Sequence, residues 1–215
     1  LEKNINKKNV LITGAGGSIG SELARQIVSL RPSKIVLLDN SEFNLYTIHQ
    51  ELSSLVINIE IIPSLCTTTN YYQLKKIISQ HQINTIYHAA AYKHVPMVEM
   101  NIVSGVYNNV VGTYNIAKAA DELKVDSMVL VSSDKAVRPT NVMGASKRFA
   151  ELVLQAFSDK SSTCFSMVRF GNVLDSAGSV VPLFRSQIKK GGPVTVTHRN
   201  ITRYFMTIPE SVQLV

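Results

Sequence analysis

The sequence predicts an α/β fold built on a doubly wound parallel sheet. Short β-branched and aliphatic runs alternate with helical patterns along most of the chain. A glycine-rich turn also joins the first of these runs to the first helical pattern. The 215 residues, of which 45% are apolar and 17% charged, are enough for one globular domain with a substantial core.

Six apolar runs are expected to form buried strands: 9–14, 34–39, 59–65, 83–90, 126–133 and 164–171. Between them, two sets of residues recur at helical spacing: Leu23, Ile27 and Leu30, then Leu74, Ile77 and Ile78. The plainest apolar stripe comes later, at Phe149, Leu152, Val153, Ala156 and Phe157. After Gly171 the pattern changes to a short helix, a Gly-Gly-Pro turn and two strand-like runs. We therefore expect a Rossmann-like domain over 1–170 and the beginning of a smaller lobe over 171–215.

The stretch VLITGAGGSIGSELARQI places the glycine-rich turn between the first strand and the first helix. Such a turn brings a pyrophosphate close to the backbone and to the free N–H groups of a helix N-terminus. Asp39 ends the next strand, where an acid accepts hydrogen bonds from an adenosine ribose and repels a 2′-phosphate. The pattern therefore favours NAD over NADP, although a purely structural turn would use the same glycines. The residues expected at the pyrophosphate are Gly14, Gly17, Ser18, Ile19 and Gly20.

Charge and composition restrict the classes of partner and of bound group that we expect for this chain. The net charge of +7 comes from scattered lysines and arginines without interleaved aromatics, so we expect no nucleic-acid partner. The two cysteines lack metal-binding spacing, and we expect no metal site. No apolar run reaches the roughly 18 residues that span a membrane. The chain begins at Leu1 and stops in a helical pattern, so we expect it to be part of a longer protein.

The stretch SSDKAVRPTNVMGASK, residues 132–147, carries the candidate chemistry. It follows the fifth expected strand, and ligands bind outside the carboxyl ends of such strands. Taken alone, Lys147 points away from the stripe of Phe149 and Leu152, as a solvated lysine would. Ser133 and Asp134 could likewise only cap a turn.

Five motifs change that interpretation: TGAGGSIG, HAAAYKHVP, NNVVGT, SSDKAVRPTNVMGASK and VRFGNVLDSAGSVVPLF. In this order they resemble the extended short-chain dehydrogenase/reductases. More narrowly, the chain resembles the bacterial capsular-polysaccharide-type 4,6-dehydratases of UDP-N-acetylglucosamine. Met143 stands where many of these enzymes carry a catalytic tyrosine. In this respect the chain resembles the long, membrane-anchored branch of the family, which carries methionine at that position.

The resemblance implies a reaction in which a hydride passes from carbon 4 of the sugar to NAD and returns to carbon 6 after water is lost. It implies that Ser133 binds the 4-hydroxyl, that Asp134 protonates the leaving 6-hydroxyl and that Lys135 removes the carbon-5 proton. Lys147 would hold the nicotinamide ribose. Met143 cannot accept the 4-hydroxyl proton, which leaves two alternatives: Asp134 itself, or a water between Ser133 and Lys147.

Other matches imply further contacts. The cofactor would meet Ala89, Ala91, Lys93, Asn109 and Ser132, and the substrate would meet Lys93, Asn172 and Arg203. Cys66 and Thr67 replace a Gly-Asp pair that meets the adenine in the family, which puts that contact in doubt.

Two other functions stay open: an epimerase acting on the same class of UDP-sugar, and a nucleotide-binding regulatory module without catalysis. We expect a cytoplasmic domain of a protein anchored in a bacterial inner membrane, able to form a homo-oligomer.

Overall fold

The structure, a computed structural model, describes residues 5–55, 58–196 and 198–215. Its centre is a sheet of six parallel strands in the order β3-β2-β1-β4-β5-β6. The strands are β1 (Asn9–Thr13), β2 (Lys34–Asp39), β3 (Glu60–Leu65), β4 (Thr85–His88), β5 (Ser127–Val131) and β6 (Cys164–Val168). The strand order reverses between β1 and β4, the place where doubly wound sheets bind ligands. The predicted fold class is confirmed.

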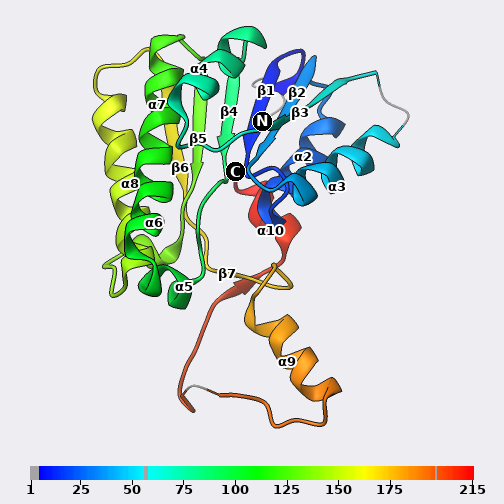
Figure 1. Cartoon of the computed structure of the whole chain (residues 1–215), viewed down its shortest axis with the longest axis vertical. Coiled ribbons are helices and arrows are strands. Elements are labelled where there is room, and N and C mark those ends of the chain that lie inside the picture. Colours follow the sequence, from blue (N-terminus) through cyan, green and yellow to red (C-terminus); the bar gives the residue numbers. More distant parts are fainter. Residues whose placement is uncertain (1–4, 56–57, 197) are drawn as a thin grey trace.

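Helices cover both faces of the sheet (Figure 1). One face carries α2 (Ser18–Ser29) and α3 (Glu42–Ser53), and the other carries α4 (Tyr71–Gln80), α7 (Gly112–Glu122) and α8 (Val142–Ser158). Successive strand side chains point to opposite faces, so Val10 and Ile12 join the first layer while Leu11 joins the second. Because both faces are covered, the strands read as continuous apolar runs.

Two segments interrupt the simple alternation of strands and helices. Between β4 and α7 the chain forms α5 (Val95–Met100), α6 (Ile102–Val106) and a π-helical turn at Tyr107–Val111. Between β5 and α8 it forms a 3-10 turn at Asp134–Ala136. Both segments lie at the carboxyl end of the sheet, where they supply side chains to the site described below.

Three strands end two or three residues before their apolar runs do. The runs 83–90, 126–133 and 164–171 leave the ladder after His88, Val131 and Val168. Each of these runs extends beyond its strand because small and apolar residues also line the groove at the end of the sheet.

After Gly171 the chain forms a small lobe that projects below the sheet in Figure 1. It contains β7 (Asn172–Val173), α9 (Val180–Lys189) and β8 (Phe205–Met206), with β7 and β8 paired in parallel. The last helix, α10 (Ile208–Gln213), returns to the main body, and Val212 packs in the core beside α2. Within the described ranges, none of the helices has the length and apolarity needed to cross a membrane.

Only part of the apolar stripe on α8 packs inward, since Phe157 contacts the core while other members face outward. Phe149 is 59% exposed and Leu152 is 42% exposed. The face that packs against the sheet contains Met143, Gly144, Ser146, Lys147, Ala150, Glu151 and Leu154. Two charged residues thus occupy the buried face, and hydropathy alone cannot find it because paired charges count as surface residues.

Candidate active site

The glycine turn shapes the middle of a groove at the switch point between β1 and β4. Gly14 has φ +66°, and a Cβ there would lie 2.7 Å from the Cα of Ala90. A Cβ on Gly20 would lie 2.0 Å from the carbonyl oxygen of Gly14, so glycine lets α2 pack directly on the turn. No side chain caps α2 at Gly17, which leaves N–H groups of its first turn open to the groove. An anionic group fits this end of the helix.

Asp39 lies at one end of the groove with 7% of its surface exposed. Its two oxygens accept hydrogen bonds from the backbone N–H groups of Gly16 and Ser41, each at 2.9 Å. These bonds fix the carboxylate at the rim of a cavity of about 190 Å³ that Cys66 and Thr67 also line. The arrangement fits the ribose of an adenine nucleotide. Burial raises the pKa of the Cys66 thiol to about 11, so this cysteine remains a neutral wall residue.

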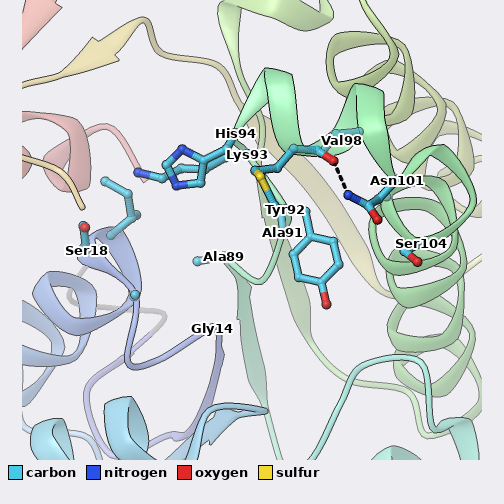
Figure 2. Close-up of a pocket in the computed structure, with 15 residues that line it drawn as sticks. Gly14, Ser18, Ala89, Ala91, Tyr92, Lys93, His94, Val98, Asn101 and Ser104 are labelled. Atoms are coloured by element: carbon cyan, nitrogen blue, oxygen red, sulfur yellow. Dashed lines mark hydrogen bonds between the residues drawn. The ribbon is translucent and has the colours of Figure 1, made fainter. Parts of the chain in front are cut away.

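Two larger cavities continue from the glycine turn. One, of about 490 Å³, lies between the turn and α5 and α6. Figure 2 shows Lys93 and His94 extending from the segment after β4 toward Ser18 at its edge. The other, of about 410 Å³, lies over the ends of β5 and β6. Ile19, Ala89, Ala91, Lys93 and His94 line both.

Lys147 and Met143 share the wall of the cavity over β5 and β6. Lys147 is only 6% exposed, and its Nζ donates a 2.6 Å hydrogen bond to the carbonyl oxygen of Val131. The solvated position that the stripe on α8 indicated is therefore wrong. Burial lowers the pKa of the ammonium to about 8, against an opposing effect of the Glu151 carboxylate. Met143, 3% exposed, makes this wall apolar.

Ser133, Asp134, Lys135 and Asn172 form a connected cluster at the same edge. The Ser133 hydroxyl and the Lys135 ammonium each donate to Asp134 Oδ1 at 3.0 Å. Lys135 also donates to Asn172 Oδ1 at 3.0 Å, which joins the end of β5 to β7. Burial alone would raise the pKa of Asp134, but its bonds with Lys135 and Ser133 lower it, so the free protein holds a carboxylate there. The fold thus brings together four predicted site residues.

Lys93 and His94 stand where the small lobe meets the glycine turn. Burial lowers the pKa of both side chains, and the Lys93 charge lowers that of His94 further. The His94 ring lies against Gly178, where a Cβ would be 2.4 Å from Cε1. Beside it, the backbone N–H of Ala177 donates to Ser18 Oγ at 3.0 Å. The loop at 174–179 therefore crosses the groove and touches both sides.

Asn109 is buried in the π-helical turn, and its amide group is fully used within the protein. It exchanges hydrogen bonds with the N–H and carbonyl of Tyr92, donates to Ser146 Oγ and accepts from Asn108. These bonds hold the segment that carries Ala91 and Lys93 along the groove. Its predicted contact with a cofactor stays a prediction.

Two other predicted residues lie differently. Arg203 is exposed and donates to the carbonyl of Thr202, and it does not line the cavity over β5 and β6. Its contact with a substrate therefore stays a prediction. Ser132 lines that cavity, but its hydroxyl donates to Glu151 at 2.6 Å.

Glu151, which has no exposed surface, is a residue of this site that the sequence motifs do not indicate. The available signal was its position four residues after Lys147, one helical turn along the same face of α8.

Comparison with known proteins agrees with this geometry. The family described as polysaccharide biosynthesis protein matches residues 10–215. The capsular polysaccharide biosynthesis protein CapD of Staphylococcus aureus is 50% identical over 217 residues, which cover 100% of this chain and 36% of CapD. The chain thus spans about a third of that relative.

Solved structures share the fold. The X-ray structure of Pen from Bacillus thuringiensis is 35% identical with a TM-score of 0.92, over 98% of this chain and 66% of Pen. DesIV, a dTDP-glucose 4,6-dehydratase of Streptomyces venezuelae solved with NAD, has a TM-score of 0.84 at 19% identity, over 95% of this chain and 70% of its own. The second likeness concerns the fold alone. From the family match and the relationship to CapD, the chain belongs to the polysaccharide biosynthesis protein family.

Proposed function

We propose that the chain is the catalytic domain of an NAD-dependent nucleotide-sugar 4,6-dehydratase that acts on UDP-N-acetylglucosamine for a surface polysaccharide. The observation that carries the proposal is the Asp134–Lys135 pair beside Ser133, in reach of the cavity that Lys147 lines. Loss of water needs an acid and a base at neighbouring carbons, and this pair offers both.

The groove fits NAD along its whole length. The open N–H groups in the first turn of α2 suit the pyrophosphate, and Asp39 suits the adenosine ribose while repelling a 2′-phosphate. NAD bound there would supply the redox chemistry, the removal of a hydride from carbon 4 of the sugar and its return at carbon 6. Lys147 would hold the nicotinamide ribose from the buried wall.

The acid and base roles follow from the hydrogen bonds. Ser133, placed against the 4-hydroxyl, already donates to Asp134, so the route from that hydroxyl through Ser133 leads to the Asp134 carboxylate. This favours Asp134 over a water near Lys147 as the group that takes the proton in place of a tyrosine. Asp134 then holds the proton that the leaving 6-hydroxyl needs. Lys135, once its own ammonium proton has passed to solvent, takes the proton from carbon 5. Returning that proton to carbon 5 completes the cycle with one water lost.

The same pair argues against the alternatives. A simple 4-epimerase leaves the 6-hydroxyl in place and needs no base for carbon 5, so Asp134 and Lys135 would have no task. A regulatory module without catalysis is favoured by Met143, which lacks a proton to transfer. The buried, oriented Lys147 and the intact cluster of Ser133 and Asp134 oppose it.

The test uses the full-length protein, because the chain spans only part of its relatives. Incubation with UDP-N-acetylglucosamine and NAD should give a UDP-4-keto-6-deoxy sugar, followed by mass spectrometry and NMR. Asp134→Asn and Lys135→Met should each lower the rate by about 10²–10⁴-fold while NAD still binds. A C4-epimerised sugar as the main product would support the epimerase instead, and an unchanged substrate would support the regulatory module.

A homo-oligomer and a membrane anchor in the full-length protein stay predictions, as does the cytoplasmic location of this domain.

A further inference from the structure

Glu151 is a charged side chain with no exposed surface. It accepts four hydrogen bonds: from Ser132 Oγ at 2.6 Å, from Arg169 Nε at 2.7 Å and Nη2 at 2.5 Å, and from Arg148 Nη1 at 2.9 Å. Burial alone would raise its pKa, but the bonds from Arg169, Ser132 and Arg148 together lower it to about 2. Glu151 is therefore a buried anion at neutral pH.

Glu151 and Lys147, one helical turn apart on α8, hold successive residues at the end of β5. Lys147 binds the carbonyl of Val131, and Glu151 binds the hydroxyl of Ser132. The next three residues carry the proposed chemistry. A change in the hydrogen bonds between α8 and the end of β5 would therefore displace the proposed acid and base directly.

The same carboxylate holds the end of β6 through the two bonds from Arg169. The N–H of Ser132 bonds to Val168, and the N–H of Asp134 bonds to Phe170, so the two strand ends are also tied to each other. Asn172 follows directly on the β6 side, where it accepts from Lys135. Glu151 thus lies behind both halves of the catalytic cluster.

The charges around Lys147 also single out Glu151. On α8 itself the neighbours are Glu151 and Arg148, and from β6 comes Arg169, whose charge is engaged by Glu151. The turn after β5 adds Asp134 and Lys135, which pair with each other. From β4 comes His88, which burial keeps neutral because its pKa falls to about 3. Glu151 is the neighbour whose charge acts against the burial of the Lys147 ammonium.

We propose that Glu151 is a positioning residue of this active site, which fixes the ends of β5 and β6 on α8 and places a negative charge one helical turn from Lys147. The activity part of this inference rests on the proposed dehydratase function. The part that concerns Lys147 does not, because it can be followed through cofactor binding alone.

If the ion pairs of Glu151 had only a structural role, the result of the substitution would be different. Its removal would lower stability and leave the pH dependence of binding and turnover unchanged. Loss of Glu151 as proposed removes the negative charge beside Lys147, so Lys147 should lose its proton at a lower pH.

The experiment compares Glu151→Gln, Glu151→Asp and Leu154→Ala in the full-length protein. Leu154 is fully buried one turn further along α8 and serves as the matched control for lost packing. Turnover of UDP-N-acetylglucosamine and the dissociation constant of NAD are measured from pH 6 to pH 9, roughly the range around the pKa of Lys147, with thermal unfolding measured alongside.

For Glu151→Gln we expect turnover to fall by about tenfold or more, with the upper pH limit of NAD binding moved down by about one unit. Glu151→Asp keeps the charge but shortens the reach, so it should lower turnover without moving that limit. Leu154→Ala should lower the unfolding temperature and leave the limit in place. If Glu151→Gln behaves like Leu154→Ala in both pH profiles, the proposal is wrong.

Two outcomes separate this inference from the proposed function. If the wild type makes no keto sugar but the pH limit of NAD binding moves in Glu151→Gln, the dehydratase function fails and the role of Glu151 on Lys147 holds. If Glu151→Gln does not fold, the milder Glu151→Asp and Ser132→Ala decide: both should lower turnover more than Leu154→Ala, and equal turnover in all three would overturn the positioning role.

Discussion

At the scale of single residues, Lys147 is a cation that the fold buries at a free-energy cost. The unfolded chain keeps an ordinary lysine, whereas the folded protein holds one whose pKa is about 8. Below about pH 8 both states bind the proton and the folded state bears the full burial cost. As pH rises from about 8 toward the ordinary value, the unfolded chain binds more protons than the folded one, so stability rises. A side chain kept in this way is typical of a functional site.

Lys147→Met should abolish turnover, because it removes the group that would hold the nicotinamide ribose. Since it also removes a costly buried charge, the variant should unfold at no lower temperature than the wild type at pH 7.

Met143→Ala should keep turnover within about tenfold, because the thioether lines the cavity and transfers no proton. This variant should unfold at a lower temperature, because the shorter side chain leaves a cavity. Thermal unfolding without NAD, together with steady-state rates of the full-length variants, checks both. Equal loss of turnover in the two variants would show that Met143 has a role in the reaction.

We expect Asp39 to decide between the two nicotinamide cofactors. Its carboxylate is fixed by Gly16 and Ser41, so it cannot swing away from a 2′-phosphate without losing two hydrogen bonds. We expect tighter binding of NAD than of NADP, and Asp39→Ala should narrow the difference, mainly by weakening NAD. Calorimetric titration with both cofactors measures this. Tighter NADP binding to the wild type would contradict the assignment.

At the scale of elements, a chain of hydrogen bonds joins β1, β4 and α7 through His88. Thr113 uses its hydroxyl hydrogen on the carbonyl of Asn109 at 2.7 Å, so its oxygen accepts from His88 Nε2 at 3.0 Å. Nδ1 is then the acceptor for the hydroxyl of Thr13 at 2.6 Å. The pairing sets the neutral tautomer, and burial lowers the pKa of the ring to about 3.

This neutral histidine predicts a loss of stability in acid. Above the ordinary pKa of histidine, His88 is unprotonated in both the folded and the unfolded protein. As pH falls from about 6.5 toward 3, the unfolded chain binds a proton at His88 that the folded protein does not bind. The free energy of unfolding should fall by up to about 1.4 kcal/mol per pH unit from this group. Urea titrations of His88→Gln between pH 7 and 4 should show a flatter dependence. His49→Gln, at a half-buried position on α3, should follow the wild type.

The elements themselves were largely predictable, because each strand is an apolar run and each run meets a turn signal. What the sequence could not show is where a strand stops, since Ala89 and Ser132 continue the small or apolar pattern beyond the ladder. Nor could it show the orientation of α8. Hydropathy counts Lys147 and Glu151 as surface residues, yet their partners Val131, Ser132 and Arg169 come from other elements and become visible only in three dimensions.

At the scale of the whole molecule, the small lobe meets the nucleotide-binding groove through the loop at 174–179. One contact is the bond from Ala177 to Ser18, at the N-terminus of α2. The other is the ring of His94 against Gly178. A reaction that returns its hydride has no need to release the cofactor between turnovers, so a loop across the groove suits the proposed function by retaining NAD.

Gly178→Val tests this arrangement. The position has φ +67°, and the new Cβ would lie 2.4 Å from the His94 ring, so the contact between the loop and the His94 ring must give way. Gly191→Val is the matched control, because it imposes a similarly strained backbone at φ +90° with no atom within 4 Å of the new Cβ. We expect both variants to lose stability, but only Gly178→Val to release NAD severalfold faster in stopped-flow displacement, since only there does the added side chain press on a residue that lines the groove. Equal release rates in the two variants would mean that backbone strain accounts for the whole effect and that the loop does not hold the cofactor in.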